Sequence, residues 1–128
     1  MTDDAVRERG ERAFDLFHRG KAFLDQRHPG QAALLLEQAL TLEPDKNSIR
    51  EALARAYYAL GRYASAAEAF EEIVRRAPTN DYAHFGLARS LLALGEVEAA
   101  RPAARLAVAM TPANADYRLA LWRCVPAS

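Results

Sequence analysis

Apolar residues recur at helical spacing along most of the chain, and the pattern is most complete between residues 47 and 80. Leu53 and Tyr57 lie four positions apart in a first apolar run, which is the spacing of one face of a helix. Gly61 interrupts that run, and a second run of the same spacing leads to Pro78. The stretch therefore predicts two amphipathic helices joined by a tight turn.

This two-helix pattern repeats along the chain with a period of 34 residues, marked by Pro44, Pro78 and Pro112. The repeats align without a gap over residues 13–46, 47–80 and 81–114. Small residues share one register at Gly20, Ala54 and Ala88 and a second at Ala32, Ala66 and Ala100, and large apolar residues share a third at Phe23, Tyr57 and Leu91. Facing small residues let the two helices of a unit approach closely. Stacked units of this kind are expected to share one continuous core.

The start of the chain predicts a long first helix. Thr2 or Asp3 is placed to cap it, and the helix is expected to extend to about Gln26, although its first dozen residues are almost all polar. A break at residues 28–30 follows, and residues 31–42 are expected to form the partner helix.

Later helices carry capping residues of their own. Ser48 and Glu51 have the spacing of a capping box, and Asn80 and Asn114 are candidate N-caps. A single helix over residues 115–125 matches only the first half of a repeat, so seven helices are expected. Pro102 falls in the second half of the third repeat. Because an interior proline removes a helical hydrogen bond, that helix either starts near Ala99 or is kinked.

The period and its order of small, aromatic and proline positions resemble the tetratricopeptide repeat family. The resemblance covers residues 13–125, although Leu16, Arg50 and His84 stand where the family pattern has tryptophan. It implies an all-α fold, a right-handed α-α superhelix of three helix-turn-helix repeats closed by one C-terminal capping helix. We expect a single domain over residues 1–128.

Composition and charge exclude several classes of function. The 128 residues carry 17 basic and 17 acidic side chains, so no net field attracts nucleic acid or an anionic membrane, and we expect neither partner. Cys124 is the single cysteine, which excludes a disulfide framework. The N-terminus lacks the apolar core of a signal peptide, so we expect a cytoplasmic protein. The chain uses arginine and alanine more often than lysine, which is typical of a bacterial sequence.

Catalytic chemistry is not expected. His18, His28 and His84 lack the spacing of metal ligands, and the sequence has no glycine-rich phosphate loop or nucleophile elbow. We therefore predict no enzyme activity, no metal and no cofactor. His84 is expected to be a partly buried packing residue.

One face of each first helix is left over after packing, and in the tetratricopeptide family this face lines the concave groove that holds partner peptides. The candidate partner-binding residues on it are Phe17, Lys21, Arg55, Tyr58, Tyr82, Phe85, Arg89 and Arg123. Its four cations recur every 34 residues, and only Arg55 has an acid, Glu51, four positions earlier. A row of cations beside aromatic rings favours an acidic, partly apolar segment. The alternative is that these arginines stay solvated or pair with acids on neighbouring helices.

Two further comparisons refine the prediction. Ala52 and Tyr82 stand at the asparagine and lysine places of the carboxylate clamp found in chaperone-binding members of the family, so binding of a chaperone tail is not expected. Trp122 stands at the register of Gly20, where an indole would block a closely packed second helix. With Leu121 and Val125, Trp122 is expected either to close the end of the core or to dock a partner or a second copy of the chain.

The sequence thus predicts a non-catalytic adaptor or chaperone-like protein that holds a partner segment. One alternative is a structural scaffold that self-associates through the ends of the helical stack, for example as a homodimer. Another is a regulatory subunit of an enzyme.

Overall fold

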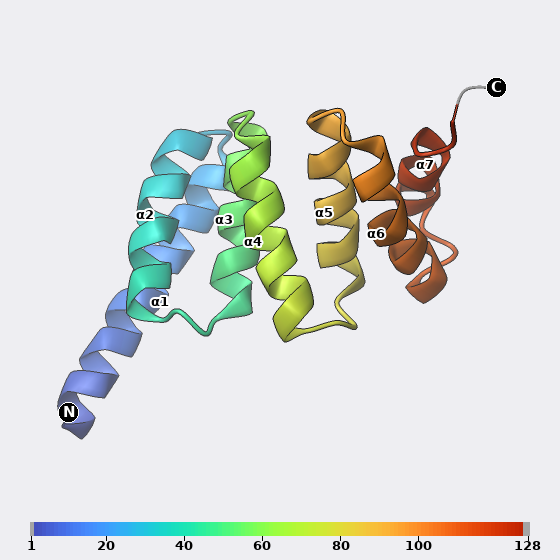
Figure 1. The fold of residues 1–128 in the computed structure, drawn as a ribbon. Coiled ribbons are helices and arrows are strands. Elements are labelled where there is room, and N and C mark those ends of the chain that lie inside the picture. Colours follow the sequence, from blue (N-terminus) through green and yellow to red (C-terminus); the bar gives the residue numbers. More distant parts are fainter. Residues whose placement is uncertain (1, 127–128) are drawn as a thin grey trace. The chain divides into compact units, whose positions relative to one another are not determined.

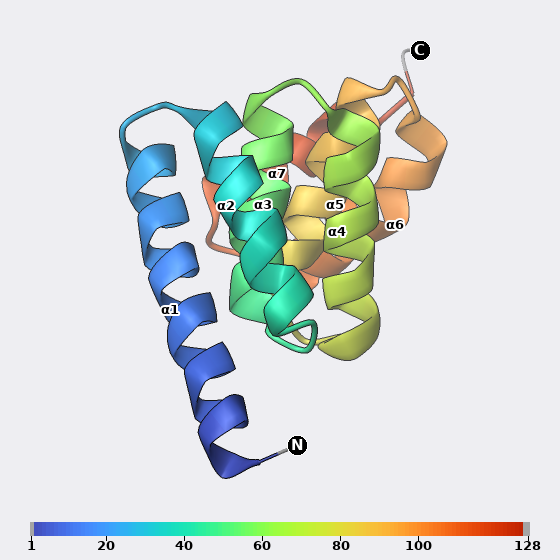
Figure 2. The ribbon, with the colours of Figure 1, turned by 90° about the vertical axis from the view of Figure 1, so that its left-hand side faces the viewer.

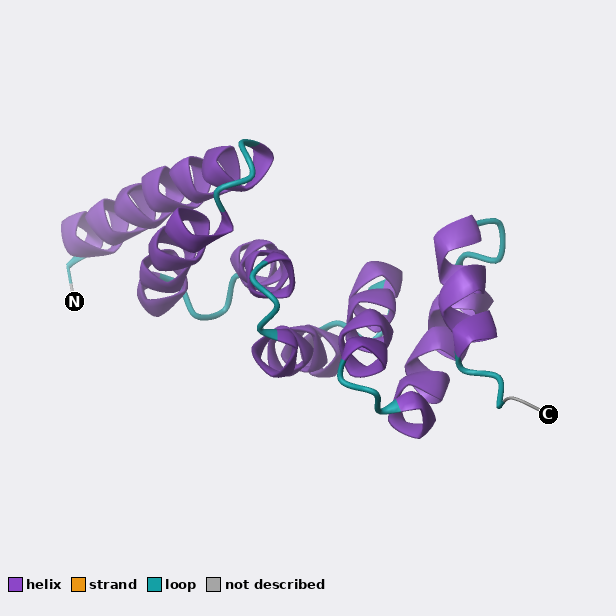
Figure 3. Cartoon of the chain, turned by 90° about the horizontal axis from the view of Figure 1, so that it is seen from above, coloured by secondary structure: helices purple, strands orange, loops and turns teal. Residues whose placement is uncertain are grey.

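The computed structural model describes residues 2–126, and these residues form helices and connecting loops without a strand (Figure 3). The predicted all-helical repeat fold is confirmed. The helices are α1 (Asp3–Asp25), α2 (Pro29–Leu42), α3 (Asn47–Ala59), α4 (Tyr63–Arg76), α5 (Asp81–Ala93), α6 (Val97–Met110) and α7 (Ala115–Arg123). They form two compact units. Unit 1 ends at Gly61 and unit 2 starts at Arg62, in the turn between α3 and α4.

Unit 1 contains α1, α2 and α3. Helix α2 packs against both α1 and α3, and the N-terminal part of α1 extends beyond α2 (Figures 1 and 2). The predicted close approach of α1 and α2 is confirmed, because a Cβ atom at Gly20 would lie 2.7 Å from Cγ of Leu36 and 3.5 Å from the carbonyl oxygen of Ala32. Ala32 and Leu36 are fully buried, so the small residue in α1 makes room for the side chains of α2.

Unit 2 contains α4 to α7. Helix α5 packs between α4 and α6, and α7 contacts both α6 and α5. A second close approach occurs here, where a Cβ atom at Gly86 would overlap the ring of Phe70. Ala100 of α6 is fully buried, as its place in the repeat predicts.

Side chains cap three of the helices at the predicted residues. Thr2 Oγ1 accepts a hydrogen bond from the Ala5 amide, and the side chains of Asn80 and Asn114 do the same for α5 and α7. The capping box at Ser48 is wrong. Helix α3 starts at Asn47, two residues before the start that a cap at Ser48 would give, and no side chain caps it.

The structure also fixes the starts of two other helices. Helix α2 begins at Pro29 instead of residue 31, because the first helical residue needs no amide hydrogen and the fixed φ of proline suits that position. Helix α6 begins at Val97, so Pro102 lies in its interior, which excludes the alternative that this helix starts near Ala99. Since proline has no N–H, the carbonyl of Glu98 lacks its usual helical donor.

The polar residues at the register where the family pattern has tryptophan all form a hydrogen bond to a proline carbonyl. Arg50 Nη2 donates to the carbonyl oxygen of Pro44 at 2.5 Å, and Arg118 Nη1 donates to that of Pro112 at 2.7 Å. His84 Nε2 lies 2.8 Å from the Pro78 carbonyl oxygen, and because a carbonyl only accepts, Nε2 carries the hydrogen. His84 is buried, more deeply than its predicted partial burial. In each case the side chain ties a helix to the turn before it.

Arg27 occupies a backbone position that favours glycine. Its φ is 63°, while Gly61 and Gly95, one and two periods later, have φ values of 76° and 80°. A side chain in this left-handed region costs about 1–2 kcal/mol. We therefore expect Arg27→Gly to raise the free energy of unfolding by about 1 kcal/mol in chemical denaturation.

The matched control is Gly95→Ala, where an added Cβ meets nothing within 4 Å. It should lower the free energy of unfolding by a similar amount through backbone strain alone. Equal stability of the Arg27→Gly variant and the wild type would show that the conformation of Arg27 is not strained.

Candidate functional site

The eight predicted partner-binding residues lie in two sets, one in each unit. In unit 1, α1 carries Phe17 and Lys21 and α3 carries Arg55 and Tyr58; in unit 2, α5 carries Tyr82, Phe85 and Arg89 and α7 carries Arg123. Helix α1 contacts α3, and α5 contacts α7. Each unit thus presents four of these residues on two neighbouring helices.

Two of the four cations lie over aromatic rings of their own helix. Lys21 Nζ is 5.2 Å from the ring centre of Phe17, and Arg89 Cζ is 5.3 Å from that of Phe85. Both pairs are spaced by four residues, which places their side chains next to one another on a helix. A cation over a ring at an exposed site contributes about 0.5–1 kcal/mol. The two repeats therefore present the same exposed cation beside a ring.

Arg55 and Glu51 stand four residues apart, but they form no ion pair within residues 2–126. Arg55 and Arg123 are exposed, as are Lys21 and Arg89. All four positive charges are therefore accessible to a partner. Whether a partner uses them stays a prediction.

A hydrogen-bonded aromatic cluster fills the space between α5 and α7. The rings of Phe85 and Tyr117 lie 4.8 Å apart, and Asp81 Oδ2 accepts hydrogen bonds from Thr111 Oγ1 at 2.5 Å and from the Tyr117 hydroxyl at 3.3 Å. The hydrogen bond from Thr111 is the main reason that the pKa of Asp81 lies below its usual value, while partial burial acts in the opposite direction. Asp81 is thus an acceptor that holds Tyr117 in place.

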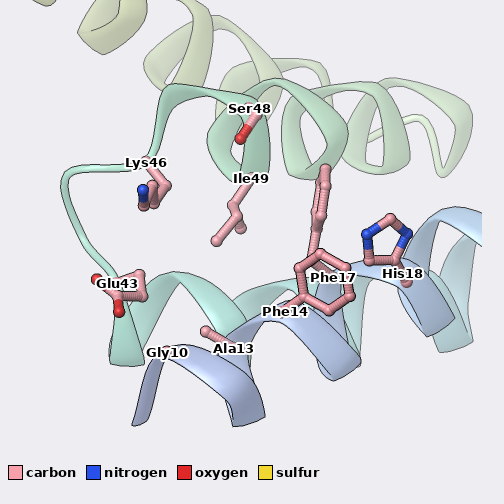
Figure 4. Close-up of a pocket in the computed structure, with 9 residues that line it drawn as sticks. All are labelled: Gly10, Ala13, Phe14, Phe17, His18, Glu43, Lys46, Ser48 and Ile49. Atoms are coloured by element: carbon pink, nitrogen blue, oxygen red, sulfur yellow. The ribbon is translucent and has the colours of Figure 1, made fainter. Parts of the chain in front are cut away.

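The corresponding space in unit 1 is open. A pocket of about 290 Å³ lies between α1, the loop before α3 and the start of α3 (Figure 4). Its lining residues are Gly10, Ala13, Phe14, Phe17, His18, Glu43, Lys46, Ser48 and Ile49. Of these, only Phe17 is among the residues that the sequence predicts to bind a partner. The repeat register could have revealed the pocket, because Ala13 and Ile49 stand where Asp81 and Tyr117 stand in unit 2.

Aromatic side chains form one side of this pocket. Phe14 is 65% exposed, and its ring centre lies 4.1 Å from that of His18, which in turn lies 5.4 Å from that of Phe17. An exposed ring that packs on a neighbouring ring offers apolar area to a partner. The pocket therefore joins the face that carries Lys21.

The end of α7 divides into an inward and an outward side. Leu121 packs against the buried cluster that contains Ala100 and Cys124, whereas Trp122 is 71% exposed and Val125 is 61% exposed. Burial raises the pKa of the Cys124 thiol, which disfavours its reactive thiolate form. Of the three predicted end residues, Trp122 and Val125 are accessible to a partner.

The structure offers two negative findings for the part of the chain that it describes. Within residues 2–126, no three histidine, cysteine or acidic side chains gather into a set that could hold a metal ion. In the same residues, no helix combines the length and the apolar character that crossing a membrane requires.

Comparisons with known proteins agree with the repeat. The tetratricopeptide repeat family model matches residues 17–81 and 52–115. The C-terminal domain containing this repeat in a putative FK506-binding protein of Plasmodium falciparum has a TM-score of 0.86 and 20% identity, covering 93% of this chain and 89% of that chain. No curated protein matches the sequence.

Two other solved structures contain bound peptides. The first repeat domain of Spaghetti (RPAP3), bound to the HSP90 peptide SRMEEVD, has a TM-score of 0.84 and 18% identity, covering 90% of this chain and 91% of that chain. The second repeat domain of human RPAP3, in complex with the HSP70 peptide SGPTIEEVD, has a TM-score of 0.81 and 14% identity, covering 93% and 97%. At these identities the likeness shows a shared fold.

Proposed function

Because the chain belongs to the tetratricopeptide repeat family, we propose that it is a cytoplasmic adaptor or chaperone-like protein that binds a segment of a partner protein without catalysing a reaction. Domains of the same fold have been solved with peptides bound, which supports a protein-interaction module. The partner segment is acidic and partly apolar.

The observation that carries this proposal is the repeated placement of an exposed cation over a phenylalanine ring. Lys21 over Phe17 in unit 1 and Arg89 over Phe85 in unit 2 place an exposed charge at the same register. Because Phe85 is only 8% exposed, the apolar area beside the charge comes from the half-buried Phe17 in unit 1 and from the half-buried Tyr82 in unit 2. A carboxylate can pair with the cation while an apolar side chain covers the ring. Arg55 adds a third exposed cation on α3.

The experiment selects ligands from a random peptide library displayed on phage. We expect enrichment of peptides with acidic residues next to apolar ones, and affinity that falls as salt is added, because the Debye length shrinks from about 10 Å at 0.1 M to about 3 Å at 1 M. The peptide SRMEEVD serves as a comparison and should bind more weakly, because Ala52 and Tyr82 replace the clamp residues of the chaperone-binding members.

Replacing Arg55 and Arg89 together by alanine should weaken binding of a selected peptide by about 1 kcal/mol, the size expected for exposed charge pairs. Isothermal titration calorimetry gives this value. The matched control, Arg12→Ala with Arg105→Ala, also removes one exposed cation from each unit and should leave affinity unchanged. The proposal fails if both double variants bind alike, or if the Arg55 and Arg89 variant unfolds.

A second candidate function is self-association through α7, favoured by the exposure of Trp122 and Val125. The register of Trp122 is occupied in α1 and α5 by Gly20 and Ala88, which are buried in their units. Trp122 thus lies on a face that a neighbour could cover. In this candidate function a second copy of the chain covers it and forms a homodimer.

Light scattering over a range of protein concentrations tests the dimer. The apparent mass should rise with concentration and the tryptophan emission should shift to the blue as the indole is buried. Trp122→Ala should remain monomeric, and Leu34→Ala, which removes another exposed side chain, should behave as wild type. A monomer with unchanged fluorescence at every concentration would exclude this function.

A further inference from the structure

The pocket of unit 1 has a filled counterpart two repeat periods later in the chain. Asp81, Phe85 and Tyr117 stand in the registers of Ala13, Phe17 and Ile49. In unit 2 the Tyr117 ring packs on Phe85 with centres 4.8 Å apart, and its hydroxyl donates to Asp81. A tyrosine side chain therefore occupies the place between α5 and α7 that corresponds to the pocket between α1 and α3.

Smaller side chains leave this place open in unit 1. Ala13 and Ile49 are buried and are shorter than the aspartate and tyrosine at their registers in unit 2. The half-buried ring of Phe17 remains as a wall of the pocket. At about 290 Å³, the pocket lies at the lower limit of small-molecule sites, which span roughly 300–1,000 Å³. Its size thus suits one side chain better than a cofactor.

The polar residues of the pocket match a phenol. Figure 4 shows Glu43 and Lys46 on the side of the pocket away from the rings of Phe14 and Phe17. The Glu43 carboxylate accepts hydrogen bonds and the Lys46 ammonium donates them, so a hydroxyl between them can do both. Glu43 also takes the register of Thr111, a member of the hydrogen-bonded cluster of unit 2.

We propose that this pocket binds one tyrosine side chain of the partner segment, with the ring against Phe17 and the hydroxyl between Glu43 and Lys46. The proposal rests on the proposed function and names the residue that the partner inserts. A phenylalanine ring would fill the same space without the hydrogen bonds that the hydroxyl makes to Glu43 and Lys46. The acidic residues of the same segment would then lie near Lys21, one helical turn beyond Phe17.

In the test, N-acetyl-L-tyrosine amide is titrated into the full chain and its binding is followed by NMR. Saturable shifts are expected at Ala13, Ile49 and the neighbouring residues of the pocket. N-acetyl-L-phenylalanine amide, which lacks the hydroxyl, should bind about threefold to tenfold more weakly, the factor expected for one hydrogen bond.

Two variants close the pocket in different ways. The ring introduced by Ile49→Tyr would fill the pocket as Tyr117 fills the corresponding place in unit 2. This variant should therefore abolish binding of the probe. Gly10→Leu places a side chain at the edge of the pocket, where an added Cβ meets only Glu43 at 3.6 Å, and should do the same without changing the core. The control is Leu106→Tyr, which adds a tyrosine at an exposed position of α6 and should leave binding intact.

Several results would overturn the proposal. These are the absence of saturable shifts, equal binding of the two amides, or probe binding that persists in a folded Ile49→Tyr or Gly10→Leu variant. Binding of free p-cresol without binding of the tyrosine amide would also overturn it, because the pocket would then accept a small phenol and no peptide side chain.

The outcome is separable from that of the proposed function. A library-selected peptide that binds the wild type and Gly10→Leu equally, but loses affinity for the Arg55 and Arg89 variant, would refute the tyrosine pocket alone. The opposite result is that the probe needs the pocket, while the affinity of a selected peptide does not change when the two arginines are replaced. This result would refute the proposed charge recognition alone.

Discussion

Replacing Leu36 by alanine is expected to lower the free energy of unfolding by roughly 2–5 kcal/mol. Leu36 is fully buried in α2 and belongs to the unit 1 cluster that includes Ala52 and Leu53 of α3. Its side chain also fills the space left by Gly20 of α1. Truncation would therefore open a cavity between three helices, and urea denaturation followed by circular dichroism measures the loss.

Leu34→Ala is the matched control, because Leu34 lies on the same helix and is 63% exposed. It should change the free energy of unfolding by less than about 0.5 kcal/mol. A second comparison adds Gly20→Ala, whose Cβ would lie 2.7 Å from Cγ of Leu36. Gly20→Ala should lower the free energy of unfolding by less in the Leu36→Ala protein than in the wild type. Additive costs, or equal effects at Leu34 and Leu36, would contradict the packing described for unit 1.

Replacing Gly86 by alanine is expected to destabilise the protein although alanine is the better helix former. The added Cβ would overlap the ring of Phe70, which is 2% exposed and packs against Tyr82 at 6.0 Å. Overpacking costs about 1–3 kcal/mol, while the helix propensity of alanine returns up to about 1 kcal/mol. We expect a net loss of about 1–2 kcal/mol in urea denaturation.

Gly30→Ala provides the control for helix propensity. An added Cβ at Gly30, in α2, meets nothing within 4 Å, so this variant should be as stable as the wild type or slightly more stable. Stabilisation by Gly86→Ala would mean that the Phe70 ring moves aside at little cost. Because the Phe70 ring packs against Tyr82, a predicted partner-binding residue, displacing this ring should also weaken peptide binding.

The candidate site was predictable only where it follows the repeat. The spacing of Lys21, Arg55 and Arg89 places each cation on the same face of a first helix, and the structure keeps all three exposed. The position of Phe17 and Phe85 four residues earlier is also visible in the sequence, and both rings lie beneath a cation. The pocket depends on Ala13 and Ile49, whose types are ordinary for a core, so only a comparison with Asp81 and Tyr117 at the same registers distinguishes them.

The sequence by itself determined the period, the number and order of the helices and the three side-chain caps at Thr2, Asn80 and Asn114. These features are local, since a helix depends on contacts between residues three or four positions apart, and a 34-residue period places the same small residues in the same registers. Asn80 and Asn114 could be recognised as caps because the group that each one binds lies three residues further along its own helix.

Only the tertiary structure decided which side chains meet between helices. Arg50 reaches the Pro44 carbonyl and α3 starts at Asn47 without a side-chain cap, so the local preference of Ser48 does not set the helix start. Leu121 packs inward while Trp122 points outward, although both are large and apolar. The space between α1 and α3 stays open, whereas Tyr117 fills that between α5 and α7. Each of these outcomes depends on the volume and direction of side chains far apart in the sequence, which periodicity alone does not encode.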